Sequence, residues 1–150
     1  TVKDIQTLDG SLEQAVVVQS ITLLLEDYVD ISRGDMLSAA NRPAELLKTV
    51  NADLCWLSEE PLDTRRKYWL KHTTRQVAAR VTKIDTLLDI NTQEKRPADE
   101  VKLNGIARVT LNVAQPLAAD AYDAIRSTGS FILIDEVTHQ TVAAGMIRLD

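Results

Sequence analysis

The chain has few residues of several types, and each shortage excludes a class of protein. Of its 150 residues only one, Cys55, is a cysteine, so an intramolecular disulfide framework is excluded and a reducing compartment is favoured. No apolar run approaches the ~20 residues that a membrane-spanning helix needs, and the N-terminus carries no targeting pattern. We therefore expect a cytoplasmic protein that contacts no membrane. The first residue, Thr1, is not a methionine, which favours a fragment or a processed chain.

Catalytic motifs are missing as well. Nothing matches the phosphate-binding G-x-x-x-x-G-K-[ST] loop. His72 and His139 have no Cys or acidic partner at metal-ligand spacing. Asp135 and Glu136 are adjacent, so they point apart in an extended chain, and a carboxyl group in an exposed turn has no raised pKa for acid catalysis. Cys55 lies in an apolar run, which predicts a buried small hydrophobe and not a nucleophile. We predict no catalytic, cofactor-binding or metal site in this chain.

Charge is acidic in total but uneven along the chain. The net charge of −5 argues against a nucleic-acid partner, since such proteins usually present a basic face. The segment from Thr64 to Lys83 holds seven Lys or Arg and no acid, which leaves the rest of the chain strongly acidic. A basic segment of this kind is a candidate interface for a protein partner or a nucleotide phosphate, through Arg65, Lys67, Lys71 and Arg75. The alternative is a solvated outer face, which is the more common role of a charge run.

The apolar residues that are present follow a period of two, which predicts strands. The last stretch, from Phe131 to Ile147, has two β-branched apolar runs around a polar turn and predicts a closing hairpin. Alternating apolar sets predict three more strands, with each set on one face of its strand: Val50, Ala52, Leu54 and Trp56; Val77, Ala79 and Val81; and Ala107, Val109, Leu111 and Val113, which point inward or outward as a set. Further strands are expected at residues 2–5, 16–26, 36–37 and 67–72. The fold class is therefore all-β.

Turn and breaker residues divide these strands. Asp9-Gly10 and Asn104-Gly105 predict tight turns, and residues 38–44 have the composition of a linker. We expect Pro116 to end the strand that begins at Ile106, because proline cannot donate in a central ladder. Residues 85–96 predict a strand with an insertion, and residues 121–126 a single helical turn.

Three motifs, in this order, resemble those of translation-factor GTPases. Asp30-Ile-Ser-Arg-Gly-Asp35 resembles a turn near the end of their second domain, and Ala114-Gln-Pro-Leu-Ala-Ala-Asp120 with Thr141-Val-Ala-Ala-Gly-Met-Ile147 resembles the end of the third domain of elongation factor Tu. Within that superfamily the chain resembles the GTPase, or large, subunit of bacterial sulfate adenylyltransferase. The residues that carry this narrower resemblance are Leu8–Glu13, Ile21–Leu23, Asp30–Asp35, Asp89–Asn91 and Leu103–Ile106.

The resemblance implies a fold and a function. It implies part of a second-domain β-barrel over residues 1–42 and a third-domain antiparallel β-barrel over residues 46–150. It also implies a non-catalytic role in an enzyme that couples GTP hydrolysis to formation of adenylyl sulfate and pyrophosphate from ATP and sulfate. GTP and Mg would bind to a GTPase domain that this chain lacks, and an adenylylsulfate kinase is fused in some members. The implied partners are the small, adenylyl-transferring subunit and the chain's own GTPase domain.

Three features add to these expectations. Val17-Val-Gln-Ser20 stands where the family has a small-residue turn with Gly, and Val does not readily adopt a positive φ, so we expect this turn to be reshaped or shifted. Arg33 and Asp35 flank Gly34, and they either fix that turn or contact the GTPase domain. A partial barrel exposes strand edges, which predicts self-association.

The alternative functions are the barrels of a translation elongation factor that help to hold aminoacyl-tRNA, and a free-standing β-barrel binding module. The acidic net charge disfavours the first of these alternatives.

Overall fold

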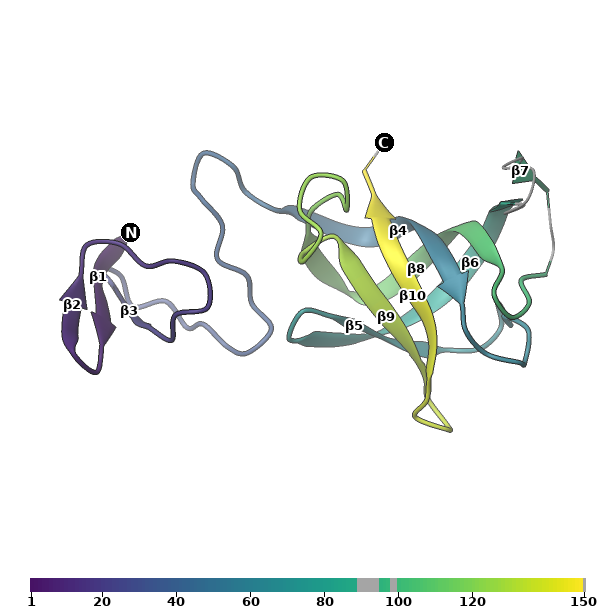
Figure 1. Cartoon of the computed structure of the whole chain (residues 1–150), viewed down its shortest axis with the longest axis horizontal. Coiled ribbons are helices and arrows are strands. Elements are labelled where there is room, and N and C mark those ends of the chain that lie inside the picture. The colour runs from purple at the N-terminus through teal and green to yellow at the C-terminus, as the bar shows by residue number, and fades with distance from the viewer. Residues whose placement is uncertain (89–94, 98–99, 150) are drawn as a thin grey trace. The chain divides into compact units, whose positions relative to one another are not determined.

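The structure is a computed structural model that describes residues 1–88, 95–97 and 100–149. Contacts between Cα atoms divide the chain into two compact units, Thr1–Ser32 and Arg33–Asp150 (Figure 1). The predicted domain boundary between residues 42 and 46 stays a prediction. In the described part of the chain every regular element is a strand, so no helix there could span a membrane.

The first unit is a three-stranded antiparallel sheet in the order β2-β1-β3. Its strands are β1 (Val2–Thr7), β2 (Gly10–Leu12) and β3 (Thr22–Leu25). The predicted turn at Asp9-Gly10 is confirmed, and Gly10 has a φ of 126°, which a residue with a Cβ rarely adopts. The strand predicted over residues 16–26 is wrong in its first half, because β3 begins only at Thr22.

The stretch before β3 is a turn in which one residue, Val18, has a left-handed backbone conformation. Val18 has a φ of 70°, the conformation that we expected a valine to avoid. The Gln19 side chain stabilises the turn, because its Oε1 accepts a 2.8 Å hydrogen bond from the Val16 backbone N–H. Val17 and Val18 are exposed, so no tertiary packing offsets the strain of the β-branched residue.

The second unit contains a closed antiparallel barrel of six strands. They are β4 (Glu45–Trp56), β5 (Tyr68–His72), β6 (Arg75–Leu88), β8 (Ile106–Ala119), β9 (Ser130–Asp135) and β10 (Thr141–Arg148). The order is β5-β9-β10-β4-β8-β6, and pairing of β6 with β5 closes the ring (Figure 1). A two-residue strand, β7 (Lys95–Arg96), extends the sheet beside β6. The predicted all-β fold class and the closing hairpin, β9 with β10, are confirmed.

The barrel core consists of the predicted alternating residues. All eleven members of the three predicted sets are buried, and Val50, Leu54, Val81 and Leu111 are fully so. Because successive side chains of a strand point to opposite faces, the residues between them lie on the outside of the barrel. The predicted turn at Asn104-Gly105 is also present, with Asn104 at a φ of 62°.

Proline does not end β8, contrary to our prediction. The strand runs through Pro116 to Ala119, where it pairs with the first residues of β4. Pairing is irregular here, because Thr49 faces Asn112 while Leu47 faces Leu117. Pro116 therefore lies in a bulge, where its missing N–H costs no ladder hydrogen bond.

Three smaller predictions have mixed outcomes. Residues 36–37 form no strand, and residues 121–126 form hydrogen-bonded turns instead of a helix, with the Ala124 and Ile125 N–H groups both donating to the Ala121 carbonyl at 3.0 Å. Residues 85–88 continue β6 as predicted. The insertion expected beyond them, including Asp89–Asn91, lies mostly outside the described residues.

Candidate functional site

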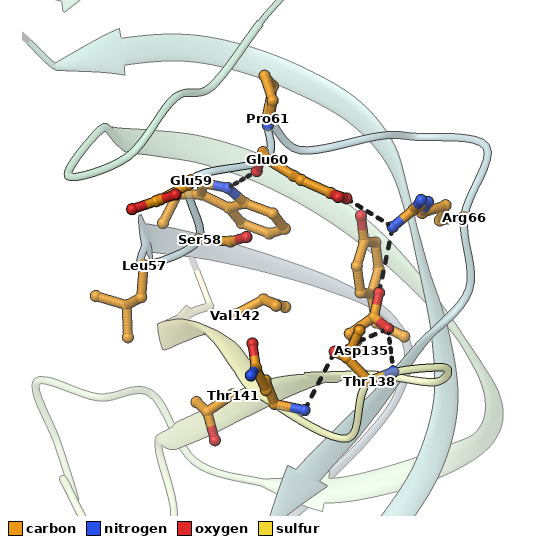
Figure 2. A pocket seen from close by; sticks show the side chains of 13 residues that line it. Leu57, Ser58, Glu59, Glu60, Pro61, Arg66, Asp135, Thr138, Thr141 and Val142 are labelled. Atoms are coloured by element: carbon orange, nitrogen blue, oxygen red, sulfur yellow. Dashed lines mark hydrogen bonds and ion pairs between the residues drawn. The ribbon is translucent and has the colours of Figure 1, made fainter.

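A concave pocket of about 350 Å³ lies on the barrel unit, between the loop that follows β4 and the β9–β10 turn (Figure 2). Trp56 and Tyr68 form part of its wall and meet edge to face, with ring centroids 5.8 Å apart and an interplanar angle of 82°. The indole N–H of Trp56 donates a 2.8 Å hydrogen bond to the Glu60 carbonyl, so the loop is anchored to the barrel. Burial raises the pKa of the Tyr68 hydroxyl, which therefore stays protonated at neutral pH.

Arg66 bridges two carboxylates in this pocket. One of its terminal nitrogens lies 3.2 Å from Glu60 Oε2 and 3.4 Å from Asp135 Oδ2. Figure 2 shows the guanidinium between the two acids, which come from segments far apart in the chain. Sequence patterns did not predict this cluster, because a surface arginine in a basic run carries no signal of its acidic neighbours.

Asp135 is only 5% exposed, so its carboxylate is not in the exposed turn that we predicted. Its Oδ1 accepts hydrogen bonds from the N–H groups of Thr138 and Val137, at 2.8 and 2.9 Å. The bond from Thr138 lowers the pKa of Asp135 most, and although burial acts in the opposite direction the net shift is downward. Asp135 therefore stays ionised and fixes the turn, and it is unsuited to donate a proton.

The lining of the pocket includes carboxylate, hydroxyl and guanidinium groups that can bind a polar ligand. It holds no cysteine or histidine, and its buried acid is held in the ionised form. Among the residues that the structure describes, no group of three or more His, Cys, Asp or Glu side chains could hold a metal ion. His72 is buried, and its Nε2 lies 2.7 Å from the Thr128 carbonyl, which satisfies it structurally.

The basic segment divides into paired and unpaired cations. Arg65 pairs with Asp63, Arg66 with Glu60 and Asp135, Arg75 with Asp35, and Lys83 with Asp85. In the described part of the chain no ion pair involves Lys67, Lys71 or Arg80, and all three are exposed. Of the four predicted interface residues, Lys67 and Lys71 are thus available to an outside anion, whereas Arg65 and Arg75 already have acidic neighbours.

The predicted turn at Arg33 and Asp35 meets one of these cations. Asp35 Oδ1 lies 3.5 Å from Arg75 Nη1, and Arg75 Nη2 donates a 3.3 Å hydrogen bond to Gln115 Oε1. Gly34 has a φ of 101°, and a Cβ there would lie 3.3 Å from the Arg75 Cβ. The turn is therefore seated on the start of β6, and the two predicted sites meet at Arg75. A contact of Arg33 or Asp35 with a GTPase domain stays a prediction.

A second cluster that the sequence did not reveal lies on the outside of the barrel. The Asp53 carboxylate accepts 2.8 Å hydrogen bonds from Nε of both Arg108 and Arg148, and Arg148 also pairs with Asp123. Burial alone would raise the pKa of Asp53, but the bonds from the two arginines outweigh it and hold the pKa below its ordinary value. The cluster joins β4, β8 and β10 and is structural.

Cys55, on the same side of β4, is only half-buried, which corrects the prediction of a buried residue.

Comparison with known proteins gives the class to which this barrel belongs. Residues 49–148 match the family described as GTP-eEF1A C-terminal domain-like, and the chain belongs to this family. A crystal structure of sup35 complexed with GDP has the same fold, with a TM-score of 0.82 at 19% identity, over 97% of this chain and 36% of that one.

Closer relatives confirm the narrower resemblance. The chain is 46% identical over 147 residues to sulfate adenylyltransferase subunit 1 of Shewanella woodyi, and 43% identical over 148 residues to that of Laribacter hongkongensis. Each comparison covers 98% of this chain and 31% of the relative. The chain therefore spans less than a third of the length of these curated relatives.

Proposed function

We propose that the chain is the C-terminal barrel region of the large subunit of a GTP-dependent sulfate adenylyltransferase. Similarity to sulfate adenylyltransferase subunit 1 along nearly the whole chain supports this proposal most directly. In this role the barrels orient a GTPase domain and dock the small subunit, and they carry no catalytic group themselves. The complete cytoplasmic enzyme would form adenylyl sulfate and pyrophosphate from ATP and sulfate, coupled to GTP hydrolysis.

The non-catalytic role is consistent with the chemistry of the described residues. The two carboxylates beside Arg66 are both paired, and the pKa of Asp135 is lowered, whereas an acid catalyst needs a raised one. GTP and Mg would bind elsewhere in the complete protein, because phosphate-binding loops have a sequence pattern that these 150 residues lack.

Two measurements test the proposal. The encoded protein that contains this chain, purified with the small subunit of the same organism, should form a complex that makes adenylyl sulfate in the presence of ATP, sulfate and GTP. The isolated 150-residue chain should bind neither GTP nor ATP in a calorimetric titration. Failure of the complex to form, or tight binding of GTP by the isolated chain, would contradict the assignment.

The alternative in which the barrels help to hold aminoacyl-tRNA has weaker support. The likeness to sup35 is at 19% identity, which bears on the fold alone. The net charge of −5 also opposes the attraction to phosphate that RNA binding requires. A filter-binding assay at low salt distinguishes the two, and we expect no retention of aminoacyl-tRNA. Self-association of the isolated chain stays a prediction, which gel filtration can test.

A further inference from the structure

The outside of the barrel has two sides of different chemistry. On β6, β8 and the middle of β4 the outward residues are mostly polar, as expected for a solvated face; the polar ones include Asn51, Arg80, Thr82, Thr110 and Asn112. On β5, β9, β10 and the end of β4 the outward residues are mostly apolar; they are Cys55, Trp69, Ile132, Ile134, Ala144 and Met146. We call this second side the apolar outer face.

Strand register makes the apolar outer face continuous. Cys55 pairs with Ala144, Ala144 with Ile132, and Ile132 with Lys71, which forms one row across four strands. Trp69 pairs with Ile134 in the next outward row. A hollow of about 540 Å³ lies over the first row and is lined in part by all four of its residues and by Met146. Contiguous apolar surface of this kind, rimmed by polar groups, marks an interaction site more often than scattered apolar residues do.

The β5 edge of this face is positive, and its two lysines are unpaired. Lys71 ends the first row, and Lys67 directly precedes β5; both are exposed, and neither has an ion-pair partner in the described part of the chain. An occupant with carboxylates around an apolar centre would complement both the hollow and the two ammonium groups.

We propose that the apolar outer face is the docking surface for a different polypeptide, whose contact surface has an apolar centre and an acidic rim. The inference rests on the proposed function, under which that polypeptide is the small subunit. It narrows the predicted interface from four cations to Lys67 and Lys71 and adds the apolar row as the main contact area. Apolar contacts at the centre give the affinity, and the lysines raise the association rate.

The experiment compares matched variants of the encoded protein that contains this chain, titrated with the small subunit. Ile132→Ser removes the centre of the row, and Leu46→Ser is its control, since Leu46 is an apolar side chain on β4 that is 74% exposed and lies outside the face. Lys71→Gln removes a rim charge, and Arg80→Gln makes the same charge change on the polar side. Tryptophan fluorescence, from Trp56 and Trp69 in the barrel, checks that each variant is folded.

We expect Ile132→Ser to raise the dissociation constant for the small subunit by about tenfold or more. Lys71→Gln should lower the association rate constant and make that constant less dependent on salt concentration. Both controls should have dissociation constants within about twofold of that of the unaltered protein. If Ile132→Ser does not fold, the exposed Lys71→Gln variant decides the outcome by its salt dependence. Equal binding by variants and controls overturns this inference while leaving the proposed function intact. No binding by the unaltered protein overturns both, and a homodimer that Ile132→Ser dissociates would overturn the inference by assigning the face to a second copy.

Discussion

Gly145, in the middle of β10, has no room for a side chain. An added Cβ would lie 2.2 Å from Phe131 Cζ and 2.5 and 2.6 Å from the two Cε atoms, whereas carbon atoms in contact are about 3.5–4.0 Å apart. Phe131 is the cross-strand partner of Gly145 and is 4% exposed, so its ring covers the glycine from within the core. Gly145→Ala must therefore displace a buried aromatic ring.

The expected net cost of Gly145→Ala is about 1 kcal/mol of unfolding free energy. Overpacking a core costs roughly 1–3 kcal/mol, and the gain from replacing glycine in a strand, about 0.5–1 kcal/mol, offsets only part of it. Phe131→Ala alone should cost about 3–5 kcal/mol by leaving a cavity. In the double variant the alanine methyl group occupies part of that cavity. The double variant should therefore lose about 1–2 kcal/mol less stability than the sum of the losses in the two single variants.

Urea denaturation followed by tryptophan fluorescence measures these values, and both tryptophans belong to the barrel unit. Unfolding of the first unit does not enter the signal, because that unit contains no tryptophan. An unchanged midpoint for Gly145→Ala, or strict additivity of the two substitutions, would refute the contact between the ring and the glycine.

Three further predictions concern other parts of the chain. Val18→Asn should stabilise the first unit by about 1 kcal/mol, because asparagine adopts a positive φ more readily than valine; slower amide exchange in β1 and β3 would show it, and equal exchange would contradict it. Asp53→Asn should cost the barrel about 1–2 kcal/mol at pH 7, since two arginines lose a charged acceptor. The pKa of Asp53 in the folded state is lowered from 3.8, so the ionised carboxylate stabilises the barrel fully above pH 3.8 and loses this effect as pH falls through the folded pKa. The urea midpoints of Asp53→Asn and the unaltered protein should therefore converge as pH is lowered. A difference that stays constant with pH would contradict the charge-based cost. Gly34→Ala should loosen the turn on Arg75, because an added methyl group would be strained at a φ of 101° and crowded by the Arg75 Cβ; faster proteolysis within residues 33–44, with no change in the urea midpoint of the barrel, is the expected result.

Period-two alternation was sufficient to identify most of the barrel. Val50, Ala52, Leu54 and Trp56 share one face as predicted, and the structure shows that this face is the inward one. Local turn chemistry was equally informative at Gly10, where a positive φ is needed.

Predictions failed where a contact distant in sequence decides the conformation. Pro116 can lie within β8 only because β4 shifts register beside it, and proline's own preference contains no information on its partner strand. The stretch before Thr22 has β-branched residues and still forms a turn, since β1, the strand beside β3, pairs only with residues from Thr22 to Leu25.

The candidate sites show the same division. The sequence by itself determined the all-β class, the residues that share one face of a strand and the basic composition of residues 64–83, because each depends on periodicity or local charge. Only the tertiary structure decided which cations are paired: Arg66 meets Asp135, and Arg75 meets Asp35, through contacts between segments 69 and 40 residues apart. It also decided that Cys55, Ala144, Ile132 and Lys71 form one outward row, because strand register is set by packing of the closed barrel and not by any one strand.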